Sequence, residues 1–395
     1  MSTKFPWASD YLKNYGHAKE EFGDWVDRYL YFTEQGDPLA DALVAELAGL
    51  PKEEGHQLLT KAIEEGLSSI PDPPPALRAF FQEVERVPFW VDWDLMKKGS
   101  DTFFLNANLF LMAFVAHVLP VGFCTNINKP FLITGRLTTM GPNRLRANNR
   151  QLVESFMPDG LRRFGDGYKL SLRVRVVHAQ VRRLLQASPE WDRAAWGLPL
   201  HSAHMAYAYA AFSAVLFNTA RNLGADVGPV DEAGFMAVWR YQGFLLGVPV
   251  EFLVSDVASG LRIQQVGWFV EPGIDDNARL IVNAMVHASP IVAGVEDPEE
   301  RRNLSQLMYN VSRGLIGDEI ADDLNFPRFK KQITPDSIRL KTKARQLLAK
   351  LTPHGQDKIR MQNLETLFTA SAFQKGGFMD YSLPQHVKGW IQHVD

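Results

Sequence analysis

The chain has 395 residues, of which 46% are hydrophobic and 22% are charged, and its net charge is −3. This composition is ordinary for a globular protein and lets a chain of this length bury a sizeable core. The small negative charge argues against a general nucleic-acid binder, which carries a strong basic excess, and the single cysteine, Cys124, excludes an intrachain disulfide and a cysteine-based zinc site.

The N-terminal part of the chain has the pattern of amphipathic helices. It begins without the apolar segment of a secretory signal peptide, so a cytoplasmic protein is expected. Hydrophobic periodicity predicts helices over residues 8–34, 39–49 and 55–68. The consecutive prolines of SSIPDPPPAL, residues 68–77, cannot continue a helix. We therefore predict three parts: an N-terminal helical extension (1–74), a main domain (75–330) and a C-terminal helical appendage (331–395).

The main domain is also dominated by helical periodicity, and clear two-residue alternation is rare. Helices are predicted over residues 76–86, 92–120, 142–157, 168–187, 201–222, 231–246, 275–289 and 298–315, with another over 335–351 in the appendage. Residues 260–270, GLRIQQVGWFV, are the one fair strand candidate. The predicted fold class is all-α.

The apolar stretch 103–123 is long enough to cross a membrane. It contains four residues that are costly in hydrocarbon, namely Asn106, Asn108, His117 and Pro120. A buried core helix is therefore predicted, and no stable membrane insertion is expected.

Several enzyme classes have short sequence motifs that this chain lacks. It contains no nucleophile elbow, no His-Glu-x-x-His zinc motif, no dinucleotide-binding glycine pattern and no phosphate loop. Glu53 and His56 form only one of the two Glu-x-x-His pairs that a di-iron bundle requires. His201 and His204 lie one turn apart without a carboxylate at helical spacing, so a local structural role is at least as well supported as metal binding.

His178 stands between two kinds of side chain on the predicted helix 168–187. At about 100° per residue, an apolar group lies within about 60° on one side of it (Val174, Val181 and Leu185) and two arginines lie on the other (Arg175 and Arg182). Nearby arginines disfavour the protonated form of a histidine, and the neutral imidazole is the form that ligates a metal.

Two interpretations of this helix are open. An imidazole beside an apolar wall and two guanidinium groups suits haem b, which needs an iron ligand, an apolar slot and cations for two propionates. The alternative is an ordinary core histidine bonded to a backbone carbonyl, with the arginines on a solvated face.

A second helix of interest is the one predicted over 142–157, which begins at Pro142 in the stretch GPNRLRANNRQLVESF, 141–156. It carries a polar stripe (Arg144, Asn148, Gln151 and Ser155) and an apolar stripe (Leu145, Leu152, Val153 and Phe156). The polar stripe is either a solvated face or one wall of a site.

An ordered set of short elements extends this pattern. The set comprises VPFWVDWDLMKKG at 87–99, TGRL at 134–137, Arg144-Leu145, VRVVHAQVRR at 174–183, Trp191-Asp192, WGLPL at 196–200, AFSAVLF at 211–217, WRYQGFLLGV at 239–248 and SRGLIGDEIADDL at 312–324. Together these elements resemble the rubber oxygenase (latex clearing protein) and MpaB-like family.

The resemblance implies an all-α, globin-like haem-binding bundle that holds haem b. His178 matches the family's proximal iron ligand, and Arg175 and Arg182 match arginines that flank it. Arg144 matches an arginine on the distal side, where Asn148 would add a hydrogen bond. Arg313 is a weaker third candidate for the haem propionates.

The chain departs from the family pattern at two functional positions. Rubber oxygenases carry Arg-x-x-Lys-Thr where this chain has Arg144, Ala147 and Asn148, so no lysine can reach the sixth iron position. The glutamate proposed as a base in that family falls near Asn128, which cannot remove a proton at neutral pH. Cleavage of polyisoprene by the same acid–base route is therefore not expected.

These features predict a haem b-dependent oxidoreductase that acts on a hydrophobic small molecule with O2 or H2O2 as co-substrate. The missing lysine and glutamate favour a different hypothesis, in which the protein is a non-catalytic haem sensor or carrier, or binds an apolar ligand. The colour of the purified protein is the simplest observation that bears on both.

Overall fold

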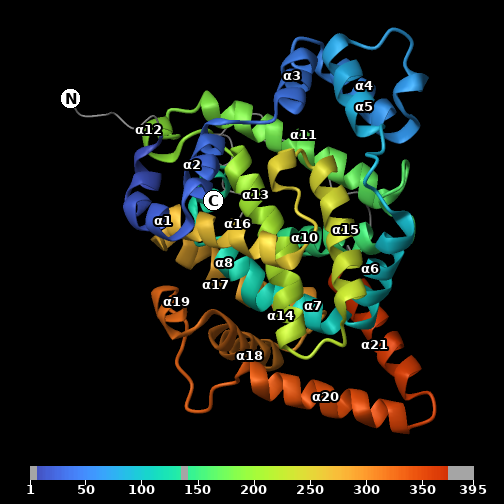
Figure 1. The fold of residues 1–395 in the computed structure, drawn as a ribbon, viewed down its shortest axis with the longest axis vertical. Coiled ribbons are helices and arrows are strands. Elements are labelled where there is room, and N and C mark those ends of the chain that lie inside the picture. Colours follow the sequence, from blue (N-terminus) through green and yellow to red (C-terminus); the bar gives the residue numbers. More distant parts are fainter. Residues whose placement is uncertain (1–6, 135–140, 372–395) are drawn as a thin grey trace.

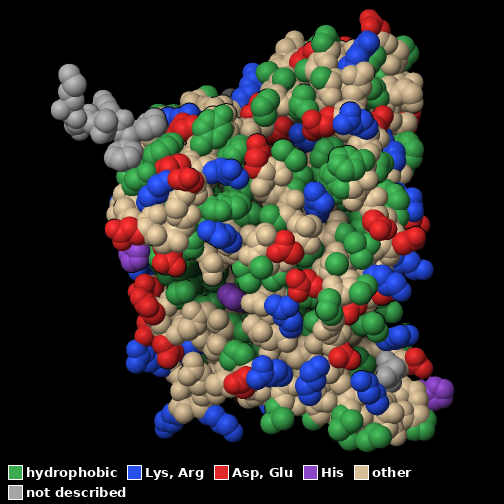
Figure 2. Space-filling view, in the orientation of Figure 1, with side chains coloured by type: hydrophobic (Ala, Val, Ile, Leu, Met, Phe, Trp, Pro, Cys, Tyr) green, Lys and Arg blue, Asp and Glu red, His purple; other side chains and the backbone are tan. Residues whose placement is uncertain are grey.

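The structure is a computed structural model that describes residues 7–134 and 141–371. Every regular element in these two ranges is helical, which confirms the predicted all-α class. The helices form a layered bundle, with α20 and α21 along one edge (Figure 1). The face seen in Figure 2 carries Lys, Arg, Asp and Glu side chains in mixture, in keeping with the small net charge.

The N-terminal region contains four α-helices and three short 3-10 helices. They are η1 (Ser9–Leu12), α1 (Tyr15–Phe22), α2 (Asp24–Tyr31), η2 (Phe32–Glu34), α3 (Pro38–Leu47), α4 (Lys52–Glu65) and η3 (Leu67–Ser69). The helix predicted over 8–34 is interrupted at Gly23, whose φ of 60° favours glycine.

The main domain begins with α5 and ends with α19. Its first half contains α5 (Pro75–Val84), α6 (Trp93–Leu105), α7 (Ala107–Ala113), η4 (Phe114–Val118), α8 (Leu119–Gly122), η5 (Asn126–Asn128), α9 (Lys129–Ile133), α10 (Gly141–Phe156), α11 (Asp166–Gln186) and α12 (Arg193–Trp196). Its second half contains α13 (Ser202–Ala210), η6 (Ala211–Val215), α14 (Leu216–Asn222), α15 (Pro229–Leu245), η7 (Val250–Phe252), α16 (Val257–Val270), α17 (Asp276–Val292), α18 (Pro298–Ile316) and α19 (Asp318–Asp323).

The C-terminal appendage contains α20 (Pro335–Leu351) and α21 (Gly355–Ser371). The predicted helical character of residues 352–395 can be followed only to Ser371, and the remainder lies outside the described residues. The boundaries of the three predicted parts stay a prediction.

The strand prediction for residues 260–270 was wrong, because this segment belongs to α16. Asp256 caps the helix by accepting a hydrogen bond from the backbone N–H of Ser259. The β-branched residues of the segment suggested a strand, but the buried positions Gly260, Ile263 and Gly267 follow helical spacing. Gly267 also lets α16 approach α13 closely, since a Cβ atom at this position would lie 2.5 Å from the ring of Tyr207 on α13.

The single helix predicted over 92–120 is broken at Asn106. Its side-chain Nδ2 donates to the carbonyl of Thr102 (3.0 Å), and its Oδ1 accepts from the backbone N–H of Asp226 (3.1 Å). The amide thus satisfies backbone groups at the break, and the two halves are bent by 82°. Among the described helices none is long and apolar enough alone to cross a membrane, and only this bent pair passes by length and composition.

The core is held by a stack of buried phenylalanines from four helices. Phe103 of α6 stacks on Phe156 of α10 with ring centroids 4.4 Å apart. Phe235 of α15 stacks on both Phe156 and Phe110 of α7, at 4.9 Å each. Such ring pairs contribute about 0.5–1.5 kcal/mol beyond the area they bury. The stack fixes α10 against α6 and α15.

The N-terminal extension is held to α11 by ion pairs with two buried arginines. Arg175 Nε and Nη2 donate to the two carboxylate oxygens of Asp37 (2.6 and 3.0 Å), and Nη2 also reaches Glu83 (3.2 Å). Arg182 Nε donates to Asp41 (2.9 Å). The two arginines are only 4% and 3% exposed. Buried guanidinium groups require such partners, so α3 is pinned across α11.

We expect Asp37→Asn to lower the free energy of unfolding by about 3 kcal/mol, because it leaves the buried Arg175 guanidinium poorly compensated. Asparagine still caps α3, so the change tests the charge and not the cap. Urea denaturation measures the loss. The matched control is Asp72→Asn, which removes an exposed pair with Arg78 and should cost less than about 1 kcal/mol. Equal effects of the two substitutions would contradict the stabilising role of the buried pair.

Candidate functional site

His178 lies in the second half of α11, the longest helix described, and its side chain is half-buried with a buried Nδ1 atom. The alternative interpretation placed the neighbouring arginines on a solvated face. That part was wrong, because Arg175 and Arg182 are both buried against carboxylates. The two arginines that flank the half-buried histidine on α11 are therefore held in ion pairs.

An apolar wall adjoins the histidine on α11. Val177, its neighbour in sequence, packs against a small cluster made of Val181, Leu185, Trp191 and Leu200. Met205 of α13 and Ile133 of α9 pack against the same cluster. Val177, Met205 and Ile133 are half-buried. Three helices that are distant in sequence thus bring apolar side chains to the region next to His178.

The predicted propionate role of Arg175 and Arg182 stays a prediction. Each guanidinium already has a carboxylate partner, and Arg182 Nη1 also donates to the carbonyl of Leu200 (2.6 Å). Arg175 Nη1 is buried and has no hydrogen-bond partner among the described residues. Nη1 of Arg175 is therefore available to donate a hydrogen bond to a ligand. Burial would lower the pKa of Arg175, but hydrogen bonds to Asp37 and Glu83 raise it above its ordinary value.

Arg313 is a member of a different cluster. It is buried on α18, where Nη1 pairs with Asp318 (2.8 Å) and Nη2 with Asp322 (2.7 Å). It also donates to the carbonyl of Phe326 (2.7 Å). Its contacts join α18 to α19 and the following loop, and its predicted role at a haem stays untested.

The residues predicted on α10 are only partly described. Arg144 lies in the first turns of α10, and its side chain is outside the described part of the chain, as is the TGRL element after Thr134. Ala147 is buried, and Asn148 is half-buried one residue further on. Ser155, at the far end of the predicted polar stripe, is buried and donates to the carbonyl of Gln151 (2.7 Å). The polar stripe is therefore not a fully solvated face.

Two polar residues of α15 were missed in the sequence. Gln242 is fully buried, and neither its Oε1 nor its Nε2 has a hydrogen-bond partner in the described residues. Trp239, one turn earlier, is buried with an unpartnered Nε1. Such a buried group costs about 1–3 kcal/mol unless a ligand or water satisfies it. The sign of these buried polar groups in the sequence was a lone glutamine in the largely apolar run WRYQGFLLGV.

Helix α15 also ends beside α11. A Cβ atom at Gly247, just after α15, would lie 2.6 Å from Arg175 Nε, so only glycine allows this approach. The φ of Gly247 is +77°, which also favours glycine. The unpartnered polar groups of α15 therefore belong to a helix that packs directly on the helix of His178.

The residue near which the resemblance places the family's proposed base is Asn128. Asn128 is buried and donates through Nδ2 to Asp275 Oδ1 (3.0 Å). Partial burial raises the pKa of Asp275, but the hydrogen bond (2.6 Å) and charge of Lys129, together with hydrogen bonds from the Ala278 backbone N–H and from Asn128, outweigh it and hold the pKa below its usual value. An ion-paired carboxylate of low pKa is a poor proton acceptor.

The other candidate histidines have protein partners. His201 and His204 stack with ring centroids 3.7 Å apart. The Tyr11 hydroxyl lies 2.8 Å from His201 Nε2, and His204 Nε2 lies 2.9 Å from Glu271 Oε1. His201 Nδ1 accepts from the backbone N–H of His204 and caps α13. These contacts give the pair the local structural role considered above, joining η1 to α13 and α16.

His117 lies in η4, a π-helical turn. Its Nδ1 is hydrogen-bonded to Thr219 Oγ1 at 2.8 Å, and burial lowers the pKa of His117 to about 4. A second π-helical turn, η6, lies beside it, with the Phe114 and Phe212 rings 5.1 Å apart. Turns of this kind occur often at functional sites.

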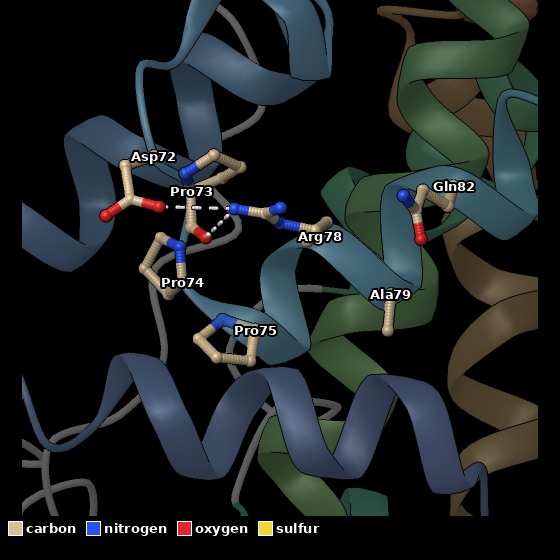
Figure 3. Close-up of a pocket in the computed structure, with 7 residues that line it drawn as sticks. All are labelled: Asp72, Pro73, Pro74, Pro75, Arg78, Ala79 and Gln82. Atoms are coloured by element: carbon tan, nitrogen blue, oxygen red, sulfur yellow. Dashed lines mark hydrogen bonds and ion pairs between the residues drawn. The ribbon is translucent and has the colours of Figure 1, made fainter.

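A surface groove lies away from these residues in the sequence, on the proline-rich connection to α5 (Figure 3). It is lined by Asp72, Pro73, Pro74, Pro75, Arg78, Ala79 and Gln82. Arg78 Nη2 turns to Asp72 (3.2 Å) and to the carbonyl of Pro73 (3.4 Å). None of the predicted site residues lines this groove. Among the described residues, no group of three or more His, Cys, Asp and Glu side chains could hold a metal ion.

Comparisons with known proteins agree with the resemblance inferred from the sequence. The model of the family described as "ER-bound oxygenase mpaB/B'/Rubber oxygenase, catalytic domain" matches residues 104–348. The rubber oxygenase of Streptomyces sp. (strain K30) is 22% identical over 250 residues, which are 58% of this chain and 56% of that protein. The chain thus matches little more than half the length of this relative.

The solved structure of latex clearing protein LCP in the closed state is similar in fold. It superposes with a TM-score of 0.64 at 16% identity, covering 85% of this chain and 91% of that one. This likeness confirms the all-helical architecture.

The low pKa of His117 predicts a pH dependence of stability. The unfolded chain takes up a proton near the ordinary histidine pKa of about 6.5, whereas the folded chain does so only near 4, so stability is lost as pH falls through this window. We expect His117→Gln to reduce the slope of unfolding free energy against pH by on the order of 1 kcal/mol per pH unit. Urea denaturation at several pH values measures it. His56→Gln, at an exposed site on α4, is the control and should leave the slope unchanged.

Proposed function

The chain belongs to the family of the ER-bound oxygenase mpaB/B' and rubber oxygenase catalytic domains, and from this premise we propose that it is a haem b-dependent oxygenase acting on a hydrophobic small molecule. His178 is the proposed iron ligand, with O2 or H2O2 as co-substrate. The observation that carries the proposal is the half-buried imidazole of His178 beside an apolar wall, on a helix where the flanking Arg175 and Arg182 are both buried.

The residues around His178 fit a haem in three respects. A neutral imidazole is a suitable axial ligand. Val177, Met205 and Ile133 supply apolar contacts of the kind that a macrocycle requires. Arg175 Nη1 is a buried donor with no protein acceptor in the described residues, and a propionate oxygen would satisfy it.

The bound haem would supply the capacity to bind and activate the oxygen co-substrate. The protein supplies the ligand and the surroundings. One ring nitrogen of His178 would hold the iron, and the proton on the other nitrogen would fix the tautomer and the ring orientation. The apolar wall would exclude water from the region next to the ligand.

The proposed distal side is α10. Arg144 would stabilise negative charge on the oxygen co-substrate, and Asn148 would donate a further hydrogen bond. Ala147 offers no donor atom, so no side chain at this position would compete for the iron. Because Asn128 stands at the position of the family's base, the proposed reaction does not use a carboxylate there as proton acceptor.

A second candidate function is a haem sensor or carrier, or an apolar-ligand-binding protein without catalysis. Ala147 and Asn128 favour it, because Ala147 lacks the sixth iron ligand and Asn128 lacks the base of the matching rubber oxygenase positions. The two functions differ in turnover. An enzyme oxidises a donor repeatedly with O2 or peroxide, whereas a carrier shows a haem spectrum and no turnover.

We expect His178→Ala to lose most of its bound haem while remaining helical by circular dichroism. The measurement is the Soret absorbance per protein after purification and after reconstitution with haem. His287→Ala, an exposed histidine on α17, is the control and should keep full occupancy. Full haem occupancy in His178→Ala would mean that the iron ligand is another histidine, with His117, His201 and His204 as the candidates.

The resting ferric protein is expected to be largely high-spin, because Ala147 provides no sixth ligand. Imidazole and cyanide should therefore bind without displacing a protein group. Ala147→Lys should convert part of the protein to a low-spin form at high pH, where the amine is uncharged. Ala147→Leu fills the same space without a donor and should stay high-spin. A low-spin spectrum of the unmodified protein in the absence of ligands would contradict the assignment.

A further inference from the structure

Helix α20 rests on the protein through one face only. The side chains of Ile338, Thr342 and Gln346 are half-buried and Ala349 is buried. These positions repeat every three or four residues, so they mark one side of the helix. This side packs against α14, α18 and α21, and the helix forms the outer edge of the molecule (Figure 1).

The opposite side of α20 is an exposed apolar stripe. It consists of Leu340 (74% exposed), Leu347 (60%), Leu348 (63%) and Leu351 (73%), together with the exposed Ala344. At about 100° per residue these five positions fall within an arc of about 100°, centred roughly opposite the buried side. An exposed apolar stripe of this kind marks an interaction surface, and none of the contacts within the described residues covers it.

Basic residues border the stripe on both sides. On the same helical projection, Lys341 and Arg345 follow one edge, and Arg339, Lys343 and Lys350 follow the other. Between 335 and 351 there are five cations and one acidic residue, Asp336, which pairs with Arg339, while Lys343 and Lys350 lie 3.6 and 3.8 Å from Asp226. Five cations and these two carboxylates leave a charge of +3 on this face, although the whole chain carries a net charge of −3. The local charge is therefore the reverse of the overall charge.

These side chains can be followed on the molecular surface. Figure 2 shows Lys and Arg side chains in a row along the lower part of the molecule, over α20, with hydrophobic side chains gathered on the rim below them. Apolar and cationic groups are thus presented side by side.

We propose that α20 binds the surface of an anionic lipid bilayer, lying in the plane of the interface. The leucine stripe enters the boundary between headgroups and acyl chains, and the bordering lysines and arginines lie at the level of the lipid phosphates and carboxylates. Long cationic side chains reach this level while their methylene groups remain in apolar contact.

Charge complementarity selects this partner over a second copy of the chain. Two α20 helices that met through their leucine stripes would bring two sets of five cations together, with only Asp336 and Asp226 beside each set. Like charges at that distance repel. An anionic bilayer instead meets the apolar stripe with hydrocarbon and the cationic borders with negative charge.

Neither haem nor catalysis is required for this binding. The apoprotein is therefore expected to bind as well as the haem-loaded protein. A failure of the membrane proposal thus leaves the proposed function standing, and the reverse also holds.

The test is flotation of the full-length protein with vesicles of phosphatidylcholine alone and of phosphatidylcholine with about one third phosphatidylserine, a headgroup that carries the negative charge the cations require. The protein should float with the anionic vesicles and bind the neutral ones at least about tenfold more weakly. Leu347→Gln combined with Leu348→Gln should weaken anionic binding by at least about tenfold. Lys341→Glu combined with Lys343→Glu should weaken anionic binding by a similar factor. High salt should weaken the binding of the unmodified protein to anionic vesicles.

The matched control is Val230→Gln combined with Leu280→Gln, two residues that are 61% and 52% exposed on α15 and α17. It should bind as the unmodified protein does. Thermal unfolding of all variants establishes that the exposed substitutions leave the fold intact.

Three results would overturn the proposal. One is the absence of binding to anionic vesicles, and another is binding that the leucine variant retains. The third is a concentration-dependent dimer, seen by light scattering, that the leucine variant abolishes while vesicles have no effect, because a second copy would then cover the stripe.

Discussion

The burial of two guanidinium groups on α11 is the constraint on which the central architecture depends. A cation removed from water is stable only beside a counter-charge, and α11 has no acidic residue of its own at the level of Arg175 and Arg182. The carboxylates come from Asp37 and Asp41, at the start of α3 and within it. The N-terminal extension is therefore held across α11, and α10 and α15 also pack on the helix that carries His178.

Helix α11 carries both supporting contacts and the residues of the proposed site. Carboxylates from the extension compensate its arginines, Val177 and its apolar neighbours form a wall, and Arg182 Nη1 donates to the carbonyl of Leu200 in that wall. The same arrangement leaves one nitrogen of Arg175 unpartnered in the described residues. A haem site proposed there would thus share its charges with the fold, so stability and cofactor retention are expected to be linked.

The proposed membrane contact and the proposed oxygenase activity concern different elements but similar chemistry. A hydrophobic substrate is concentrated in lipid, and an interfacial helix would bring the enzyme to that phase. Helix α20 packs on α14 and α18, and α14 is continuous with α13 and η6, the helical segments of Met205 and Phe212. The proposed membrane helix and the segments near the proposed haem site thus belong to one connected set of helices.

The sequence by itself determined the features that depend on near neighbours in the chain. Helical periodicity is a local property of residues three and four apart, so the all-α class, the bounds of α20 and the position of His178 between valines and arginines could all be predicted. Only the tertiary structure decided features that depend on distant residues. The break at Asn106 is satisfied by the backbone of Asp226, and the partner of Arg175 is Asp37, 138 residues away. The burial of Gln242 and the helical form of α16 follow from packing that no local pattern encodes, because β-branched residues and glutamines are compatible with more than one surrounding.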